Sequence, residues 1–504
     1  MPFLLLLFLT LACLPELWDP APPWIGSPER SALITWAAMA ATVAAAALIS
    51  WRVRRRLARD PARRAAVLRR YQSARLYHLI GQFAVFGICL YLLGWGWTVL
   101  RCCDPPQAVK AELRARPVPN NSAIEAAAAA EAPPAGPLVF ATELVLLAPF
   151  LLALVLSWAV FYDAEAALHA PADAERDGFW NRWAYVGFHI RHNLALVVIP
   201  LLLLITEKGL RRLFPEAEKE WQTVLTFAGG GLALAVFVCM PWILRLVLGL
   251  RPLPDCPLRE RLLATAKRLR FRCSNILLWN TRGGVANAMV AGILPIPRYV
   301  LLTDRLIAEL TPAEVEAVFG HEIGHVKHRH MLYYLSFLLL SLTVVWGAMT
   351  LFLPKDLSEE LAVIPLVGVL GAYIFVVFGF LSRRCERQAD IFGCRAVSCT
   401  RADCLGHCED VKLAADGRGL CPTGIRTFID ALEKVAFLNG ISRDRPGWLQ
   451  SWQHSTIARR VEFLQGMLRD PALERRFQHR VGLVKWGMLL GLCAGLAGLV
   501  LAHG

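Results

Sequence analysis

The sequence is poor in charged residues: Asp, Glu, Lys and Arg make up 19% of its 504 positions, whereas 56% are hydrophobic. With a mean hydropathy of +0.45, the composition argues against a wholly soluble basic protein of the nucleic-acid-binding type, despite a formal net charge of +14. A bare membrane bundle is also excluded, because membrane spans exclude charge and an aqueous part must carry it. We therefore expect one chain that combines membrane spans with an aqueous domain.

Apolar runs of about 18 residues or more, the length that crosses a bilayer as a helix, recur along the chain. The shorter stretch 3–13 has no positive flank before it, so a signal peptide, a ninth span and a re-entrant helix are all compatible with it. The fold class is predicted to be mainly α, a polytopic transmembrane bundle of about eight or nine spans. The long runs are 31–51, 77–100, 138–161, 186–206, 224–249, 331–353, 361–381 and 481–502.

An arginine-rich loop over residues 52–70 sets the expected orientation, because short loops rich in Lys and Arg stay on the cytoplasmic side. Alternation of the spans then places 250–330 and 382–480 on the cytoplasmic side. An ordinary solvated helix face with a nucleic-acid role is the alternative interpretation of this loop. We expect a multi-pass integral membrane protein whose partner is the lipid bilayer and not a nucleic acid.

The sharpest local signal is residues 321–325, which read His-Glu-Ile-Gly-His. His321 and His325 are four residues apart, so they share one face of a helix and can hold one Zn²⁺, while Glu322 can reach a water beside it. Thr311 with a Glu three residues later predicts a capped start for this helix. The alternative is a pair of surface histidines beside the membrane.

No third ligand follows in the local sequence. A metzincin would have Gly at 328 and His at 331, but His328 and Met331 stand there. His328 and His330 are expected to be polar residues at the membrane interface rather than ligands.

The predicted hairpin of runs 331–353 and 361–381 returns the chain to the membrane face that carries the two histidines. Glu386 can then complete a His, His, Glu set, and Asp390, one helical turn later, can accept a hydrogen bond from a ligand imidazole. The alternative is that Glu386 only pairs with neighbouring arginines.

These motifs together resemble the integral membrane zinc metallopeptidases that include the CAAX prenyl proteases and the HtpX-type proteases. Residues 287–292 are similar to the family's Asn-Ala-x-x-x-Gly strand, and residues 454–460 to its late His-Pro-x-x-x-x-Arg element, with Ser455 in place of Pro. The resemblance covers roughly 255–465. It implies a gluzincin-like zinc-protease domain that contains a small β element.

The resemblance also implies a hydrolase mechanism. Zinc held by the two histidines and Glu386 would lower the pKa of a bound water towards about 7, and Glu322 would act as general base. The family pattern nominates His454 to meet the negative oxygen of the tetrahedral intermediate, with Arg460 supporting that region. A structural histidine and a surface ion pair are the alternatives for these last two residues.

The apolar segment 285–292 is expected to supply an edge strand that holds an extended polypeptide by main-chain hydrogen bonds. Asn287, Ala288 and Gly292 are the substrate-binding residues that this predicts. A plain structural strand is the alternative.

A cysteine-rich insertion occupies residues 394–421. Cys399, Cys404, Cys408 and Cys421 predict a second, structural zinc or a redox site on the reducing inner side of the membrane. Reduced thiols, or a disulfide if the topology is inverted, stay open.

The predicted function is a membrane-embedded zinc metalloendopeptidase acting on membrane-associated or lipidated polypeptides. The alternative is a catalytically inactive membrane scaffold or signalling protein that retains a metal-binding fold. A transporter is disfavoured, because the spans lack a charged lining. The expected parts are a multi-span region (1–249), the first catalytic part (250–330), the hairpin (331–381), the second catalytic part with the insertion (382–480) and a last transmembrane helix (481–504).

Overall fold

The computed structural model describes most of the chain as continuous stretches. It also describes isolated residues before residue 24, between residues 194 and 215, and at residue 369. The described residues form two compact units, Met1–Cys239 and Met240–Gly504. The continuous described stretches are 24–114, 137–169, 179–194, 215–352, 371–399, 420–444, 455–470 and 472–503.

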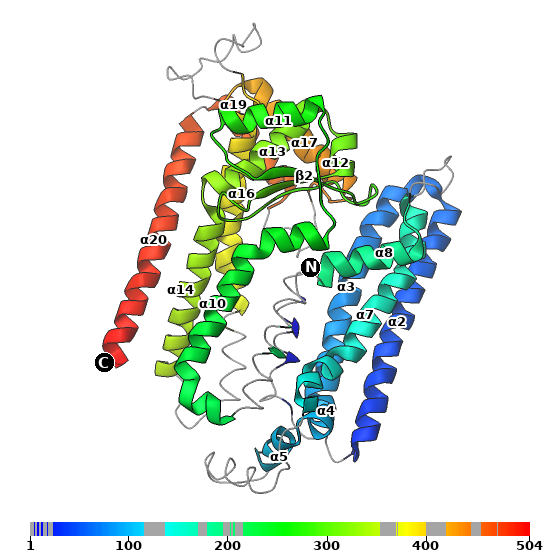
Figure 1. Ribbon diagram of the computed structural model, residues 1–504. Helices are drawn as coiled ribbons and strands as arrows, with labels where there is room; N and C mark the ends of the chain where they lie inside the picture. Colours follow the sequence, from blue (N-terminus) through cyan, green and yellow to red (C-terminus); the bar gives the residue numbers. More distant parts are fainter. Residues whose placement is uncertain are drawn as a thin grey trace. The chain divides into compact units, whose positions relative to one another are not determined.

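Three long helices lie side by side in the first unit: α2 (Pro28–Arg59), α3 (Arg64–Gly87) and α7 (Thr142–His169) (Figure 1). The side chain of Ser27 begins α2 by accepting a hydrogen bond from the Arg30 amide, which satisfies one of the free donors of the first turn. The remaining elements of this unit are η2 (Pro61–Arg63), η3 (Ile88–Leu92), α4 (Trp95–Cys103), α5 (Pro105–Arg114), η4 (Pro137–Ala141), α8 (Arg182–His189), η6 (Ile190–Leu194) and most of α10 (Pro215–Val247).

Four helices among the described residues are long and apolar enough to cross a membrane, and two shorter apolar helices accompany them. This supports a mainly helical membrane protein with several apolar helices. The predicted number of eight or nine spans is not confirmed, and parts of the runs 3–13, 186–206 and 361–381 lie outside the described residues. The four long helices are Pro28–Arg59, Ala66–Leu92, Thr142–Leu168 and Ala472–Gly498, and the shorter ones are Leu234–Val247 and His330–Val345.

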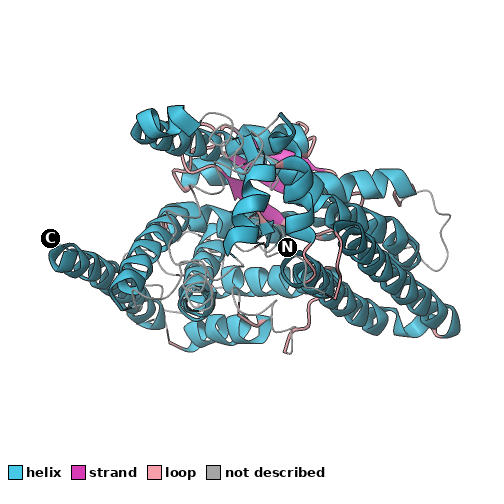
Figure 2. Ribbon diagram, turned by 90° about the horizontal axis from the view of Figure 1, so that it is seen from below, coloured by secondary structure: helices cyan, strands magenta, loops and turns pink. Residues whose placement is uncertain are grey.

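A small sheet lies among helices (Figure 2). It has four strands in the order β1-β2-β4-β3 and belongs to the second unit. β2 (Asn275–Trp279) runs parallel to β4 (Tyr299–Thr303), and β1 (Arg251–Pro252) and β3 (Ala288–Ala291) form the antiparallel edges. Every residue of β4 is buried, which explains its Tyr-Val-Leu-Leu-Thr sequence. The predicted small β element is thus confirmed, with β3 as one edge.

The helix that carries the His-Glu-Ile-Gly-His sequence is α13 (Pro312–Lys327), and it begins as the sequence predicts. Thr311 and Glu314 form a complete capping box, in which each side chain binds the other residue's backbone amide. Lys434 on α17 (Pro422–Leu438) donates to both carboxylate oxygens of Glu314, at 2.8 and 2.9 Å. This end of α13 is therefore anchored to a second helix.

Two glycines let α13 pack directly on α16 (Gly379–Ala396). A Cβ atom at Gly320 would lie 2.2 Å from the Cβ of Ala396, and one at Gly324 would lie 2.8 Å from the Cβ of Phe392. Any other residue would push the helices apart. The other elements of this unit are α11 (Pro257–Arg268), α12 (Asp304–Glu309), α14 (His330–Phe352), η7 (Ile374–Phe378), α19 (Ile457–Arg469) and α20 (Ala472–His503).

Candidate metal centre

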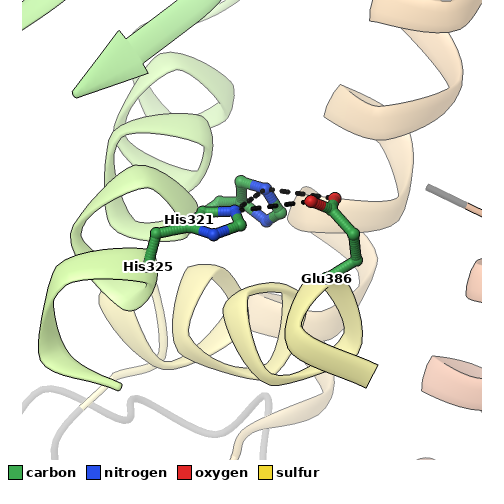
Figure 3. Close-up of side chains that lie close together, drawn as sticks. All are labelled: His321, His325 and Glu386. Carbon is green, nitrogen blue, oxygen red and sulfur yellow. Dashed lines mark hydrogen bonds and ion pairs between the residues drawn. The ribbon is translucent and has the colours of Figure 1, made fainter. Parts of the chain in front are cut away.

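The close packing of α13 and α16 brings three ligand-type side chains together: His321, His325 and Glu386 (Figure 3). The Nε2 atoms of the two histidines are 3.2 Å apart, and the Glu386 oxygens lie 3.8 Å from His321 Nε2 and 3.6 Å from His325 Nε2. Within the described part of the chain, this is the one group of three or more His, Cys, Asp or Glu residues with its ligand atoms so close together.

The spacing of these atoms fits one zinc ion. Ligand atoms about 2.1 Å from a tetrahedral ion lie about 3.4 Å from one another, and the three observed separations are 3.2, 3.6 and 3.8 Å. Two imidazoles and a carboxylate are also the donor set of a catalytic zinc site, which leaves the fourth position for water or substrate. Geometry and chemistry of the residues therefore agree with this metal.

A buried charge pair supports His321. Its Nδ1 atom lies 3.0 Å from Oδ1 of the fully buried Asp390. Arg460 on α19 binds both oxygens of that carboxylate, with Nε 2.9 Å from Oδ2, and its Nη1 lies 3.7 Å from Glu386. Arg460 is thus a buried clamp on Asp390, and the contact that orients His321 is fixed from behind.

This arrangement shifts the pKa values of His321 and Asp390. Burial alone would lower the pKa of His321, but its contact with Asp390 and the charges of Glu386 and Glu322 raise it above the usual value. Burial alone would raise the pKa of Asp390, but the charge of Arg460 and its bonds hold that pKa below the usual value. The His321 side of the centre is therefore strongly charged.

The His325 side differs. Burial, with the nearby charge of His321, lowers the pKa of His325 to about 4. Its Nδ1 atom faces Nδ1 of His330 at 3.0 Å, and Nε2 of His330 lies 3.2 Å from Oε1 of Gln388. A neutral ring, not a carboxylate, therefore lies behind this ligand.

The structure corrects the interpretation of His330 as an interfacial polar residue, because its side chain is completely buried. The helix α13 ends at Lys327 with His328 as its cap, and Arg329 takes a left-handed conformation (φ 52°) before α14 starts at His330. This turn places His330 behind His325. The only sequence signal for His330 was its place five residues after His325. That spacing does not match the three- or four-residue repeat of a helix face, so it did not point to the site.

The predicted general base contacts the predicted substrate strand. The Val290 amide on edge strand β3 donates to Oε2 of Glu322 at 3.2 Å. Asn287 is exposed just before this strand and Ala288 is its first, buried residue. Gly292 follows it with φ 112°, where a Cβ would lie 2.2 Å from the Pro297 carbonyl oxygen, so the strand ends at a position that requires glycine.

Several predicted residues lie outside the described part of the chain: His454, Cys404 and Cys408. Of the other two cysteines, Cys421 is buried and accepts a hydrogen bond from the Gly424 amide at the start of α17, at 3.2 Å, and Cys399 is half-buried. The second zinc therefore stays a prediction.

Comparison with known proteins matches residues 258–467 to Peptidase family M48. A Protease HtpX homolog of Pyrobaculum islandicum is 36% identical over 98 residues, 19% of this chain and 26% of that protein. A CAAX prenyl protease 1 homolog of Arabidopsis thaliana is 30% identical over 181 residues, 32% of this chain and 40% of that protein. These matches span about a quarter to two fifths of the relatives' length, and they confirm the resemblance seen in the sequence.

The crystal structure of S. mikatae Ste24p was also found in the comparison. It is 17% identical to this chain, with a TM-score of 0.46, over 86% of this chain and 98% of that one.

Proposed function

Because residues 258–467 form a peptidase family M48 domain, we propose that the protein is a membrane-embedded zinc metalloendopeptidase. The observation that carries this proposal is the convergence of His321, His325 and Glu386, with Glu322 on the same helix. Its substrates would be membrane-associated or lipidated polypeptides, and its catalytic domain would face the cytoplasm. The names of the relatives, CAAX prenyl protease 1 homolog and Protease HtpX homolog, support a polypeptide substrate.

His321, His325 and Glu386 would hold the zinc ion. When bound, zinc would act as a Lewis acid that lowers the pKa of a water molecule and polarises the peptide carbonyl. Glu322 takes the proton from the attacking water and later delivers it to the leaving amine. Its position on α13, between the two histidines, gives it this reach without making it a ligand.

The edge of β3 that faces away from β4 would bind the substrate as an added strand. In this strand the Val290 amide points away from β4 and towards Glu322, so a bound peptide would run past the general base. Main-chain pairing of this kind gives loose sequence preference, which suits a protease that acts on varied polypeptides. His454 would stabilise the negative oxygen of the tetrahedral intermediate, and Arg460 would act through its clamp on Asp390.

The test compares cleavage and zinc content in the purified full-length protein. Glu322→Gln keeps the ligand set and removes the base, so we expect bound zinc as in wild type and a loss of polypeptide cleavage of about 10²-fold or more. Glu309→Gln, an exposed change on α12, is the matched control and should retain both properties. The substrates are an unfolded polypeptide and a lipidated peptide in detergent.

Two outcomes would count against the proposal. Cleavage that survives Glu322→Gln rejects the mechanism. Zinc bound at one equivalent without cleavage of either substrate favours the alternative, a catalytically inactive scaffold that retains the metal fold.

A further inference from the structure

We propose that His330, Gln388 and Lys485 form a hydrogen-bond relay that fixes the tautomer of His325, so that the Nε2 lone pair of His325 faces the metal position. The inference rests on the zinc site of the proposed function. It assigns positioning roles to three residues from α14, α16 and α20. Lys485 is the most remote of them, three hydrogen bonds from Nδ1 of His325.

The direction of the relay is set at Lys485. Its Nζ lies 2.8 Å from Oε1 of Gln388. A lysine ammonium has three donors and no acceptor, so the amide atom that faces it must be the oxygen. The amide nitrogen of Gln388 then faces Oε1 of Gln478, 2.6 Å away, to which it donates. Both ends of the Gln388 amide are therefore occupied in one orientation.

The same oxygen accepts the next bond. Nε2 of His330 lies 3.2 Å from Oε1 of Gln388, and because this oxygen cannot donate, Nε2 of His330 must carry a hydrogen. The Lys485 ammonium on the same oxygen disfavours a second positive charge on this ring. The remaining nitrogen of His330, Nδ1, is therefore an acceptor.

The last bond fixes the ligand. Nδ1 of His330 lies 3.0 Å from Nδ1 of His325, so His325 must donate from Nδ1. A neutral imidazole that donates from Nδ1 has its lone pair on Nε2, which is the His325 atom nearest His321 and Glu386. The relay thus presents the metal position with the electron pair that a ligand requires.

Burial makes the constraint effective. His330 is fully buried and Gln388 is 5% exposed, so water does not offer these groups other partners. In the opposite tautomer His325 would direct an N–H at the metal position, and that proton would have to move before a metal could bind. The relay removes this cost in advance.

The test measures zinc affinity of the purified full-length protein by competition with a chromophoric chelator. Lys485→Glu replaces a donor by an acceptor, so the Gln388 amide should turn and the whole relay should reverse. We expect zinc binding about 10–100-fold weaker than in wild type. Lys485→Met removes the constraint without reversing it and should give an intermediate loss, whereas Lys485→Arg keeps a donor-only cation and should bind zinc as wild type does.

The matched control is Arg480→Glu, which makes the same charge change at an exposed position of α20. It should leave the affinity unchanged. Equal zinc affinity in Lys485→Glu and Lys485→Arg would overturn the proposal, as would an equal loss in Arg480→Glu. The thermal unfolding of each metal-free variant separates a change in affinity from misfolding.

A second readout needs no zinc. The ring ¹⁵N shifts of His325 in the metal-free protein, assigned with a His325→Gln variant, should show a protonated Nδ1 in wild type and a protonated Nε2 in Lys485→Glu. A protonated Nε2 in wild type refutes the relay. This outcome is distinct from failure of the proposed function, in which zinc binds and no polypeptide is cut, or no zinc binds at all.

Discussion

The two histidines of α13 are held in place by different kinds of contact. His321 has a carboxylate behind it, and that carboxylate, Asp390, is clamped by Arg460. His325 has a neutral ring behind it, and the first charged group along that chain of contacts is Lys485, reached through His330 and Gln388. A single contact with a charged group orients His321. By contrast, His325 is oriented by the order of hydrogen-bond donors and acceptors along a chain of side chains.

This difference has a physical cost on each side. The charged side places an ion pair in a buried site, where the loss of one partner leaves an unpaired charge. The neutral side avoids this cost but depends on three helices that must all be in place. The following experiments break or sharpen the comparison, and they are ordered from the largest expected effect to the smallest.

Removal of Glu386, the proposed ligand that lies close to both histidines, should abolish metal binding even when both supports are intact. We expect Glu386→Ala to contain no zinc above background by atomic absorption, because only two protein ligands stay in place. Glu462→Ala, an exposed change on α19, is the control and should contain zinc as wild type does. A full equivalent of zinc in Glu386→Ala would contradict the ligand assignment.

Removal of Asp390 should lower the stability of the protein, because it breaks the buried charge pair on the His321 side. Asp390→Ala leaves the buried Arg460 with only its longer contact to Glu386, which we expect to cost about 3–5 kcal/mol of unfolding free energy, visible as a lowered thermal unfolding temperature. The double variant Asp390→Ala with Arg460→Met removes both charges and should recover most of that loss. If the double variant is no more stable than Asp390→Ala, the loss does not come from the charge that the single variant leaves on Arg460.

Acidification should reveal the charged side first. A proton on His321 must leave before zinc binds, and the pKa of His321 is raised, so zinc affinity should begin to fall above pH 6.5 as the pH is lowered. His325, with a pKa of about 4, stays neutral until much lower pH. The fall should therefore be about tenfold per pH unit between pH 5 and 6, as expected for one proton.

The control for this prediction is Asp390→Asn. Loss of the carboxylate lowers the pKa of His321, so the fall in zinc affinity should shift to lower pH. If zinc affinity instead fell with a dependence on two protons between pH 5 and 6, both histidines would be charged in that range. That result would contradict the predicted difference between His321 and His325.

The smallest effect is expected at the start of α13, which carries both histidines. Glu314→Gln weakens the capping box and the pair with Lys434, and we expect a loss of about 1 kcal/mol of unfolding free energy. Zinc affinity should stay near that of wild type, because Glu314 contacts neither the residues behind His321 nor those behind His325. Glu433→Gln, a change on α17 that leaves the Glu314–Lys434 pair in place, is the control.

The local features of the site could be read from the sequence. The spacing of His321 and His325 and the cap at Thr311 depend on one helix, so rules for one helix were sufficient. Prediction of Glu386 and Asp390 as site residues needed one further assumption, that a helical hairpin returns the chain to the membrane face that carries the two histidines. The structure brings these residues together.

The relay could not be read in this way. Gln388 and Lys485 are 97 residues apart, and their contact depends on how α20 packs, for which no spacing rule exists. His330 was misread because the burial of a polar side chain after a helix end is decided by tertiary packing. The span number also stays a prediction, since apolar length does not tell which runs fold as continuous helices.

The glycines at positions 320 and 324 give the centre its rigidity. Where most helix pairs keep a layer of side chains between them, α13 and α16 touch with almost nothing in between. Side chains can change rotamer and absorb a displacement, but two main chains in contact cannot. The helix that carries His321 and His325 and the helix that carries Glu386 must therefore move as one body.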